Sequence, residues 1–188
     1  MPAGDIALAF RQYWGATLDT AWLRTSGWPV IHGVARYYAS RAQLSPDDGL
    51  YHIANTTGPD EQNVNVVDSA FGNCIAKMTL LAAHDLAASA GAAPNSTFKH
   101  IADKMFIPYD SELDYHPEYL HWNGTKHTFM HQFYTKKTNV YQDRLGTNIR
   151  KVVKQEALHA ESAVGHGISL TKQADVVLMQ YLLRRILV

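Results

Sequence analysis

Residues 68–89 have the sequence DSAFGNCIAKMTLLAAHDLAAS, and this stretch decides the fold class. Its apolar side chains recur every three or four residues, which is the period of one face of an α-helix. The spaced residues are Phe71, Ile75, Met78, Leu81, Ala82 and Leu86. Gly91 follows the last of them and suits the left-handed residue that closes a helix. We therefore predict a long helix from Asp68 to about Ser89.

The same spacing extends upstream over residues 7–23 and predicts one or two amphipathic helices there. Pro29 suits the first turn of a further helix that runs to about Ala42, and Ser26 is the candidate cap of that helix. These two stretches together predict a helical hairpin.

Downstream, a helix is predicted from Ser96 to Met105, capped by Ser96 or Thr97 and ended before Pro108. The other predicted elements are a turn at 45–49, a strand-like run at 50–53, an aromatic loop at 109–124 and a final buried helix at 174–187. No alternation of strands with helices and no glycine-rich phosphate loop occurs. The sequence therefore predicts an all-α fold built of helical hairpins.

Composition limits the classes of function. The 188 residues suffice for one domain with a core, and 17 basic residues balance 17 acidic ones. Without a basic excess a nucleic-acid partner is disfavoured, and no run approaches the roughly 20 apolar residues of a membrane span. We expect neither nucleic acid nor membrane as a partner.

The cysteine and asparagine patterns say less. One cysteine, Cys74, excludes an intramolecular disulfide, and its place in the predicted long helix favours a buried residue over a catalytic thiol. The N-terminus lacks the pattern of a signal peptide, while glycosylation sequons at Asn55, Asn95 and Asn123 lean towards a secreted or vacuolar protein. The compartment stays undecided.

The segment Gly58-Pro-Asp-Glu61 places two carboxylates behind a rigid turn shortly before the long helix. A rigidly held Glu61 suits a general acid. The alternative is an ordinary acidic turn that the helix dipole favours. Nearby, His52 is either part of the same site or bound in a structural hydrogen bond.

Histidines and amides give weaker signals. His127 and His131 are four residues apart, but no third ligand follows at a clear spacing, so we expect no metal and no cofactor. Lys172 and Gln173 precede the final predicted helix. They are candidate hydrogen-bond donors to sugar hydroxyls, or else the solvated start of that helix.

Several of these motifs occur together in one known family. Residues 51–61, YHIANTTGPDE, resemble the catalytic-acid loop of glycoside hydrolase family 65, and residues 65–73 resemble the segment that follows that loop. Further similar segments are GWPV at 27–30, ARYYASR at 35–41, IPYDS at 107–111, HPEY at 116–119 and KQADVVL at 172–178. They follow the family's order, and the resemblance covers most of residues 5–183.

The resemblance implies part of an (α/α)6 barrel and inverting hydrolysis of an α-linked glucoside. Family members include acid trehalases, disaccharide phosphorylases and a glucosidase acting on glucosyl-galactosyl-hydroxylysine, and this chain is most similar to the hydrolytic branch. By resemblance Glu61 is the general acid, while Lys172 and Gln173 hold glucose hydroxyls. Asp60 and His52, in and beside the acid loop, are further candidate substrate-binding residues.

Parts of the family pattern are absent. An inverting enzyme needs a second carboxylate that activates water, and in this family that base, or the phosphate loop, follows the Lys172-Gln173 motif. We therefore expect the isolated chain, an incomplete catalytic domain, to be inactive. Residues 151–171 look like extra sequence, and Gln62-Asn63 replace the aromatic pair that usually follows the acid.

Two alternatives to a hydrolase remain at this stage. The first is a disaccharide phosphorylase that releases glucose 1-phosphate. The second is a degenerate sugar-binding remnant without catalysis. A helical scaffold with no sugar role is the remaining minor alternative, and the oligomeric state is not indicated.

Overall fold

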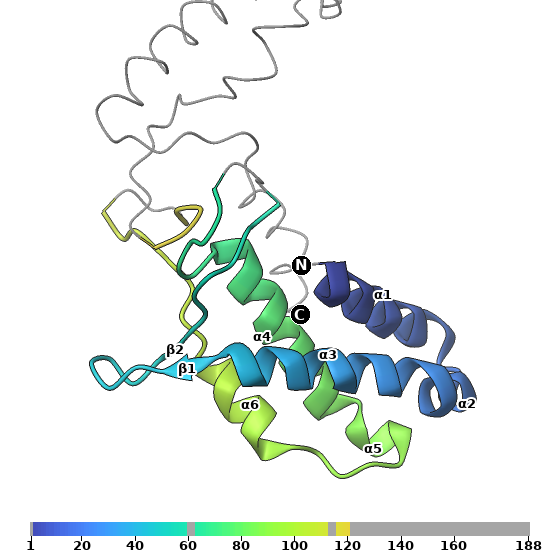
Figure 1. Ribbon diagram of the computed structural model, residues 1–188. Coiled ribbons are helices and arrows are strands. Elements are labelled where there is room, and N and C mark those ends of the chain that lie inside the picture. The colour runs from blue at the N-terminus through green and yellow to red at the C-terminus, as the bar shows by residue number, and fades with distance from the viewer. Residues whose placement is uncertain (1, 60–62, 113–115, 121–188) are drawn as a thin grey trace, which may run out of the picture.

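The structure is a computed structural model that describes residues 2–59, 63–112 and 116–120. Helices dominate these ranges, as the sequence predicted (Figure 1). The helices are α1 (Pro2–Thr17), α2 (Thr20–Trp22), the π-helix η1 (Leu23–Gly27), α3 (Trp28–Arg41), α4 (Ala70–Asp85), α5 (Ala87–Ala90) and α6 (Ser96–Asp103). The strands are β1 (Gln43–Leu44) and β2 (Tyr51–His52).

Helix α4 is the centre of the described fold, because α1, α3 and α6 all pack against it (Figure 1). Its N-terminus is capped by Ser69, whose Oγ accepts a hydrogen bond of 3.2 Å from the Gly72 N–H. The helical path breaks at Leu86 and resumes as α5, which Gly91 closes at a φ of 80°. The predicted long helix is thus confirmed, as two pieces.

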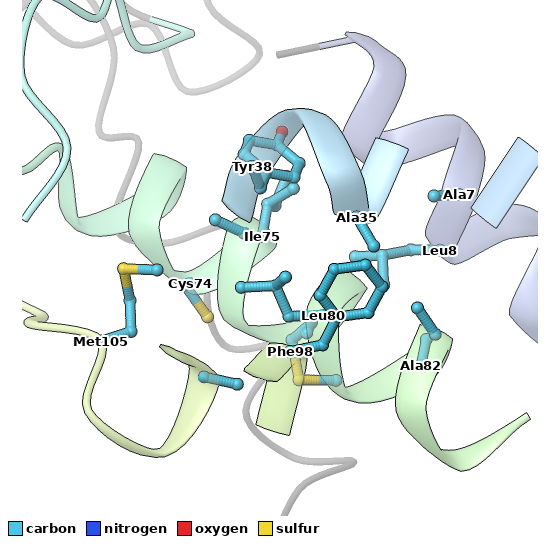
Figure 2. Close-up of a cluster of buried hydrophobic side chains, with 14 of the residues drawn as sticks. Ala7, Leu8, Ala35, Tyr38, Cys74, Ile75, Leu80, Ala82, Phe98 and Met105 are labelled. Atoms are coloured by element: carbon cyan, nitrogen blue, oxygen red, sulfur yellow. The ribbon is translucent and has the colours of Figure 1, made fainter. Parts of the chain in front are cut away.

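The hydrophobic core surrounds α4 on three sides. Figure 2 shows side chains from four helices gathered there, with Leu8 of α1, Ala35 of α3, Leu80 of α4 and Phe98 of α6 among them. Each large side chain of this kind contributes roughly 1.5–3 kcal/mol when fully buried. Packing of this core holds the helices together and fixes the N-terminal end of α4.

The predicted N-terminal hairpin forms from α1 and α3, but the cap predicted at Ser26 was wrong. Ser26 lies inside η1, and the N–H of Trp28 donates to the Leu23 carbonyl, so the helical path continues into α3 without a fresh start. Gly27 leaves room for the Trp22 ring, which would lie 2.7 Å from any Cβ at that position. That close packing accommodates the π turn before Pro29.

Helix α6 begins at Ser96, as predicted, but its cap is Asn95 and not Ser96 or Thr97. The Asn95 Oδ1 accepts hydrogen bonds from the N–H groups of Thr97 (2.9 Å) and Phe98 (3.4 Å). An asparagine side chain reaches the first free N–H groups of a helix as well as a serine does, so the three neighbouring polar residues were not distinguishable by type.

A small β-structure precedes α4, and its strand β2 lies within the strand-like run predicted at 50–53. Strands β1 and β2 pair antiparallel across a turn in which Gly49 has a φ of 71°. On the other side of β2, the Tyr51 N–H donates to the Lys104 carbonyl and the Phe106 N–H donates to the Tyr51 carbonyl, both at 2.9 Å. The end of β2 is therefore fixed next to the segment that follows α6.

The described residues of the predicted aromatic loop, 109–112 and 116–120, contain neither helix nor strand. The predicted final helix, the pair His127 and His131, and the extra segment at 151–171 lie outside the described residues. Within the described ranges, no helix is both long enough and apolar enough to span a membrane.

Candidate active site

Residues 53–59 and 63–68, the described parts on either side of positions 60–62, contain no named helix or strand, and their outer ends, Ile53 and Asp68, meet at the N-terminal end of α4. The Asp68 N–H donates to the Ile53 carbonyl at 2.9 Å, and the Ile53 N–H donates to Asp68 Oδ1 at 3.0 Å. One step further out, Thr56 and Val66 pair through two backbone hydrogen bonds of 3.1 and 2.9 Å. From here on, the acid loop means the segment between Ile53 and Asp68, which contains Glu61, and these two pairs are its neck.

The predicted acid Glu61 and its neighbour Asp60 fall in residues 60–62, outside the described ranges. The chain is described again from Asn63, whose Oδ1 accepts a hydrogen bond of 3.2 Å from the Tyr119 hydroxyl. The acid loop is therefore bound to the HPEY segment only two residues after Glu61.

The HPEY segment runs beside the chain that enters α4, as the yellow and teal segments of Figure 1 show. The Ala70 N–H donates to the Glu118 carbonyl at 2.9 Å, and the Leu120 N–H donates to the Val67 carbonyl at 3.0 Å. The upstream ARYYASR motif contributes as well, because Nη2 of Arg41 donates to the Ala54 carbonyl at 2.6 Å. Two further sequence motifs thus contact the acid loop and the chain that enters α4.

A buried carboxylate joins the neck to α4. Asp68 has no exposed surface, and its Oδ1 accepts a hydrogen bond of 2.8 Å from the Asn73 side chain in addition to the one from Ile53. Its Oδ2 lies 2.7 Å from His52 Nδ1. Asn73 also donates to the Phe106 carbonyl at 2.8 Å. Within the described residues, Oδ1 thus accepts two hydrogen bonds, and Oδ2 faces a histidine ring nitrogen.

His52 lies between two carboxylates. Its Nδ1 faces Asp68, its Nε2 lies 3.0 Å from Asp48 Oδ2, and its ring stacks on Phe106 with ring centroids 4.8 Å apart. Burial acts to lower the pKa of His52, but the hydrogen bonds and charges of Asp68 and Asp48 outweigh it and raise that pKa. The two carboxylates thus stabilise the protonated form of His52 relative to the neutral ring.

The Asp48 carboxyl has the opposite shift. A hydrogen bond from the Leu50 N–H, followed by the hydrogen bond and charge of His52, lowers the pKa of Asp48. Asp48 stands in the turn between β1 and β2, so the short hairpin also supplies a charge to the site. A turn that the sequence indicated only as a connection is therefore part of the His52 environment.

Sequence reasoning assigned no role to Asp68 or Asn73. The residue types alone carried a weak signal. Asn55, Asn65 and Asp68 adopt the left-handed backbone region, at φ values of 55°, 57° and 52°. Asparagine and aspartate are the non-glycine residues that adopt this region most readily. Sixteen residues separate His52 from Asp68, and only closure of the loop brings them together.

Two other predicted site residues, Lys172 and Gln173, lie outside the described ranges. In the part of the chain that is described, no group of three or more His, Cys, Asp or Glu side chains is arranged to hold a metal ion. Cys74 is fully buried, as predicted, and burial raises the pKa of its thiol to about 11. A thiol with that pKa is a poor nucleophile at neutral pH.

Comparison with known proteins gives the family. Residues 2–187 match the glycosyl hydrolase family 65 central catalytic domain. The chain belongs to glycoside hydrolase family 65. This membership agrees with the resemblance carried by the acid loop, the HPEY segment and the KQADVVL segment.

Two curated relatives and one solved structure illustrate the likeness within family 65. Protein-glucosylgalactosylhydroxylysine glucosidase of Danio rerio is 38% identical over 117 residues, which are 62% of this chain and 18% of that protein. Kojibiose hydrolase of Flavobacterium johnsoniae is 36% identical over 104 residues, 55% of this chain and 15% of that protein. The match thus spans less than a fifth of either relative.

The fold is shared with a solved structure, a putative kojibiose phosphorylase from human microbiome. The two superpose with a TM-score of 0.68 at 16% identity, over 98% of this chain and 25% of that one. The helical arrangement is therefore that of a segment within a larger family 65 protein.

Proposed function

We propose that the protein containing this chain cleaves a terminal α-linked glucoside by hydrolysis, with Glu61 as the general acid. The observation that carries the proposal is the closed neck of the acid loop in a chain of family 65. Hydrogen bonds fix the backbone on both sides of the segment that contains Glu61. A general acid works best when its backbone is held in place, because proton transfer requires a set distance and direction.

The chemistry follows from an inverting mechanism. Glu61 gives its proton to the glycosidic oxygen as the bond to the anomeric carbon breaks. A water molecule, deprotonated by a second carboxylate, adds to that carbon from the opposite face of the sugar. Asp60, Lys172 and Gln173 bind hydroxyl groups of the glucose whose anomeric carbon the water attacks, and the rest of the substrate departs with the protonated oxygen. The identity of the second carboxylate is not part of the proposal.

The relatives' names support a glucosyl group in the cleaved position, since one names a glucosylgalactosylhydroxylysine and the other kojibiose, a disaccharide of glucose. We further propose that α1, α3, α4 and α6 form part of an (α/α)6 barrel, which the likeness to the solved structure supports. The extra segment at 151–171 remains a prediction, to be tested by a transcript that joins Ile149 directly to Lys172.

His52 has two candidate roles in this function. A direct contact with substrate requires a free ring nitrogen, whereas both nitrogens of His52 face carboxylates at 2.7 and 3.0 Å. The geometry therefore favours the structural alternative for His52, and a substrate contact stays the less supported prediction.

The test uses the full-length gene product with kojibiose and with glucosylgalactosylhydroxylysine, in the presence and absence of inorganic phosphate. Hydrolysis predicts free glucose whose rate does not depend on phosphate. Replacing Glu61 by glutamine is expected to lower the rate by roughly 10²–10⁴-fold, the usual contribution of a general acid. Glu112→Gln, at an exposed position, is the matched control and is expected to keep the rate.

Three outcomes would change the conclusion. Full activity in Glu61→Gln overturns the assignment of the acid. Phosphate-dependent release of glucose 1-phosphate replaces hydrolysis by phosphorolysis. Glucose binding measured by titration, without turnover of either substrate by the full-length product, replaces catalysis by sugar binding.

A further inference from the structure

Placing a carboxylate at position 68 costs folding free energy, which other interactions must offset. A carboxylate without exposed surface loses its hydration, and a residue at a φ of 52° adds backbone strain of about 1–3 kcal/mol. The Asp68 carboxylate meets these costs with two hydrogen bonds and an ion pair, which reach the start of the acid loop, α4 and β2 respectively. All of these contacts converge on the neck.

The charge of His52 is set by its two neighbours. An ionised carboxylate can only accept hydrogen bonds, so a His52 ring that bonds to two ionised carboxylates carries a proton on each nitrogen. In that form the ring faces Asp68 Oδ2 at 2.7 Å as a cation, next to the Ile53–Asp68 pair of the neck. Arg41, the other cation at the neck, is directed to the Ala54 carbonyl instead. His52 is thus the counter-charge of Asp68.

The neck controls where the acid loop leaves the fold. Ile53 is buried at 3% exposure, and its N–H and carbonyl both bond to Asp68, one through the side chain and one through the backbone. If the carboxylate were lost, the N–H of Ile53 would lose its acceptor. Next to the Thr56–Val66 pair, only the bond from the Asp68 N–H to the Ile53 carbonyl would then still join the two sides of the neck.

We propose that Asp68 is a positioning residue for Glu61: paired with His52, its buried carboxylate holds the neck of the acid loop closed. This inference rests on the proposed role of Glu61 as the acid. Asp68 acts through the backbone and touches neither substrate nor the reacting atoms. Its removal impairs the proton transfer to the leaving group more than it impairs glucose binding.

The test compares Asp68→Asn with Asp47→Asn in the full-length gene product. Asparagine keeps the size of the side chain, but it removes the negative charge opposite His52, and its neutral amide oxygen is a weaker acceptor for the Ile53 N–H than a carboxylate is. Asp47 is an exposed aspartate of the neighbouring turn and is the matched control. The steady-state constants are measured with kojibiose, whose leaving group needs a proton, and with 4-nitrophenyl α-glucoside, whose leaving group does not.

Positioning through the acid gives a specific pattern. In Asp68→Asn, kcat for kojibiose falls roughly 10- to 100-fold, as expected when a catalytic group is displaced by about 1 Å, while KM changes little. The loss of kcat for 4-nitrophenyl α-glucoside is much smaller. Hydrogen exchange of the Ile53 and Val66 amides becomes faster in this variant and stays unchanged in Asp47→Asn.

Equal losses of kcat on the two substrates, or unchanged amide exchange and unchanged kcat, overturn the proposal. If Asp68→Asn does not fold, His52→Gln serves instead, because the His52 ring is partly exposed and its loss removes the partner of the Asp68 carboxylate without removing any backbone group of the neck. It must show the same substrate pattern for the proposal to stand. The role of Glu61 fails separately, when Glu61→Gln keeps its activity on kojibiose.

Discussion

Asn73 offers the sharpest test of how the buried polar network contributes to stability. Its side chain is 1% exposed and donates two hydrogen bonds of 2.8 Å, one to Asp68 Oδ1 and one to the Phe106 carbonyl. A bond to a charged group contributes about 1.5–3 kcal/mol and a neutral one about 0.5–1.5 kcal/mol. Asn73→Ala is therefore expected to lower the free energy of unfolding by roughly 2–4.5 kcal/mol.

The control lies on the same helix. Thr79 is also fully buried, but its hydroxyl has no hydrogen-bond partner among the described residues. Thr79→Val keeps the shape and removes an unsatisfied polar atom, so its stability is expected to equal or exceed that of the wild type. The assay is urea unfolding followed by far-ultraviolet circular dichroism, with unchanged m-values as a check on two-state behaviour.

The comparison of the two variants decides the argument. A loss in Asn73→Ala below about 1 kcal/mol would mean that the two bonds contribute nothing beyond an ordinary neutral hydrogen bond. An equal loss in Thr79→Val would assign the effect to any polar replacement on α4, and the network would then have no special place in stability.

Three further predictions concern packing, reactivity and pH. Gly4→Ala is expected to lower the free energy of unfolding in urea by about 1–3 kcal/mol, because the added Cβ would overlap Ile75 Cγ2 and lie 2.5 Å from Tyr38 Oη. Gly15→Ala, with open space around it, is expected to raise that free energy by up to about 1 kcal/mol. Cys74 is expected to react with a disulfide reagent at neutral pH only after unfolding, since burial raises the pKa of its thiol to about 11; fast reaction of the native chain would contradict this. His52 has a raised pKa in the folded chain, so the stability difference between wild type and His52→Gln is expected to be complete below pH of about 6.5 and to decline as pH rises through that raised pKa. A difference that grows with pH would show that the ion pairs of His52 are not its main contribution.

The fold was predictable where one helix carried its own signals. The apolar period of α4, the start near Asp68 and the stop at Gly91 are all local properties of the sequence, and the structure confirms each of them. The junction at Ser26 was not predictable in this way. Whether a helix restarts or continues as a π turn depends on Trp22 packing over Gly27, and a residue pattern does not contain that contact.

The candidate site shows the same division at longer range. His52 was identified from its nearness in sequence to the acid loop, yet its partner Asp68 was interpreted only as the start of a helix. Both interpretations were local, whereas the ion pair exists because β2 is held against residues 104–106 and α4 begins at the neck. A buried carboxylate is stabilised by a positive partner, and His52, whose protonated form this contact favours, is the residue that faces it. The stability of the neck and the protonation of His52 are therefore coupled, so a change in either one must appear in the other.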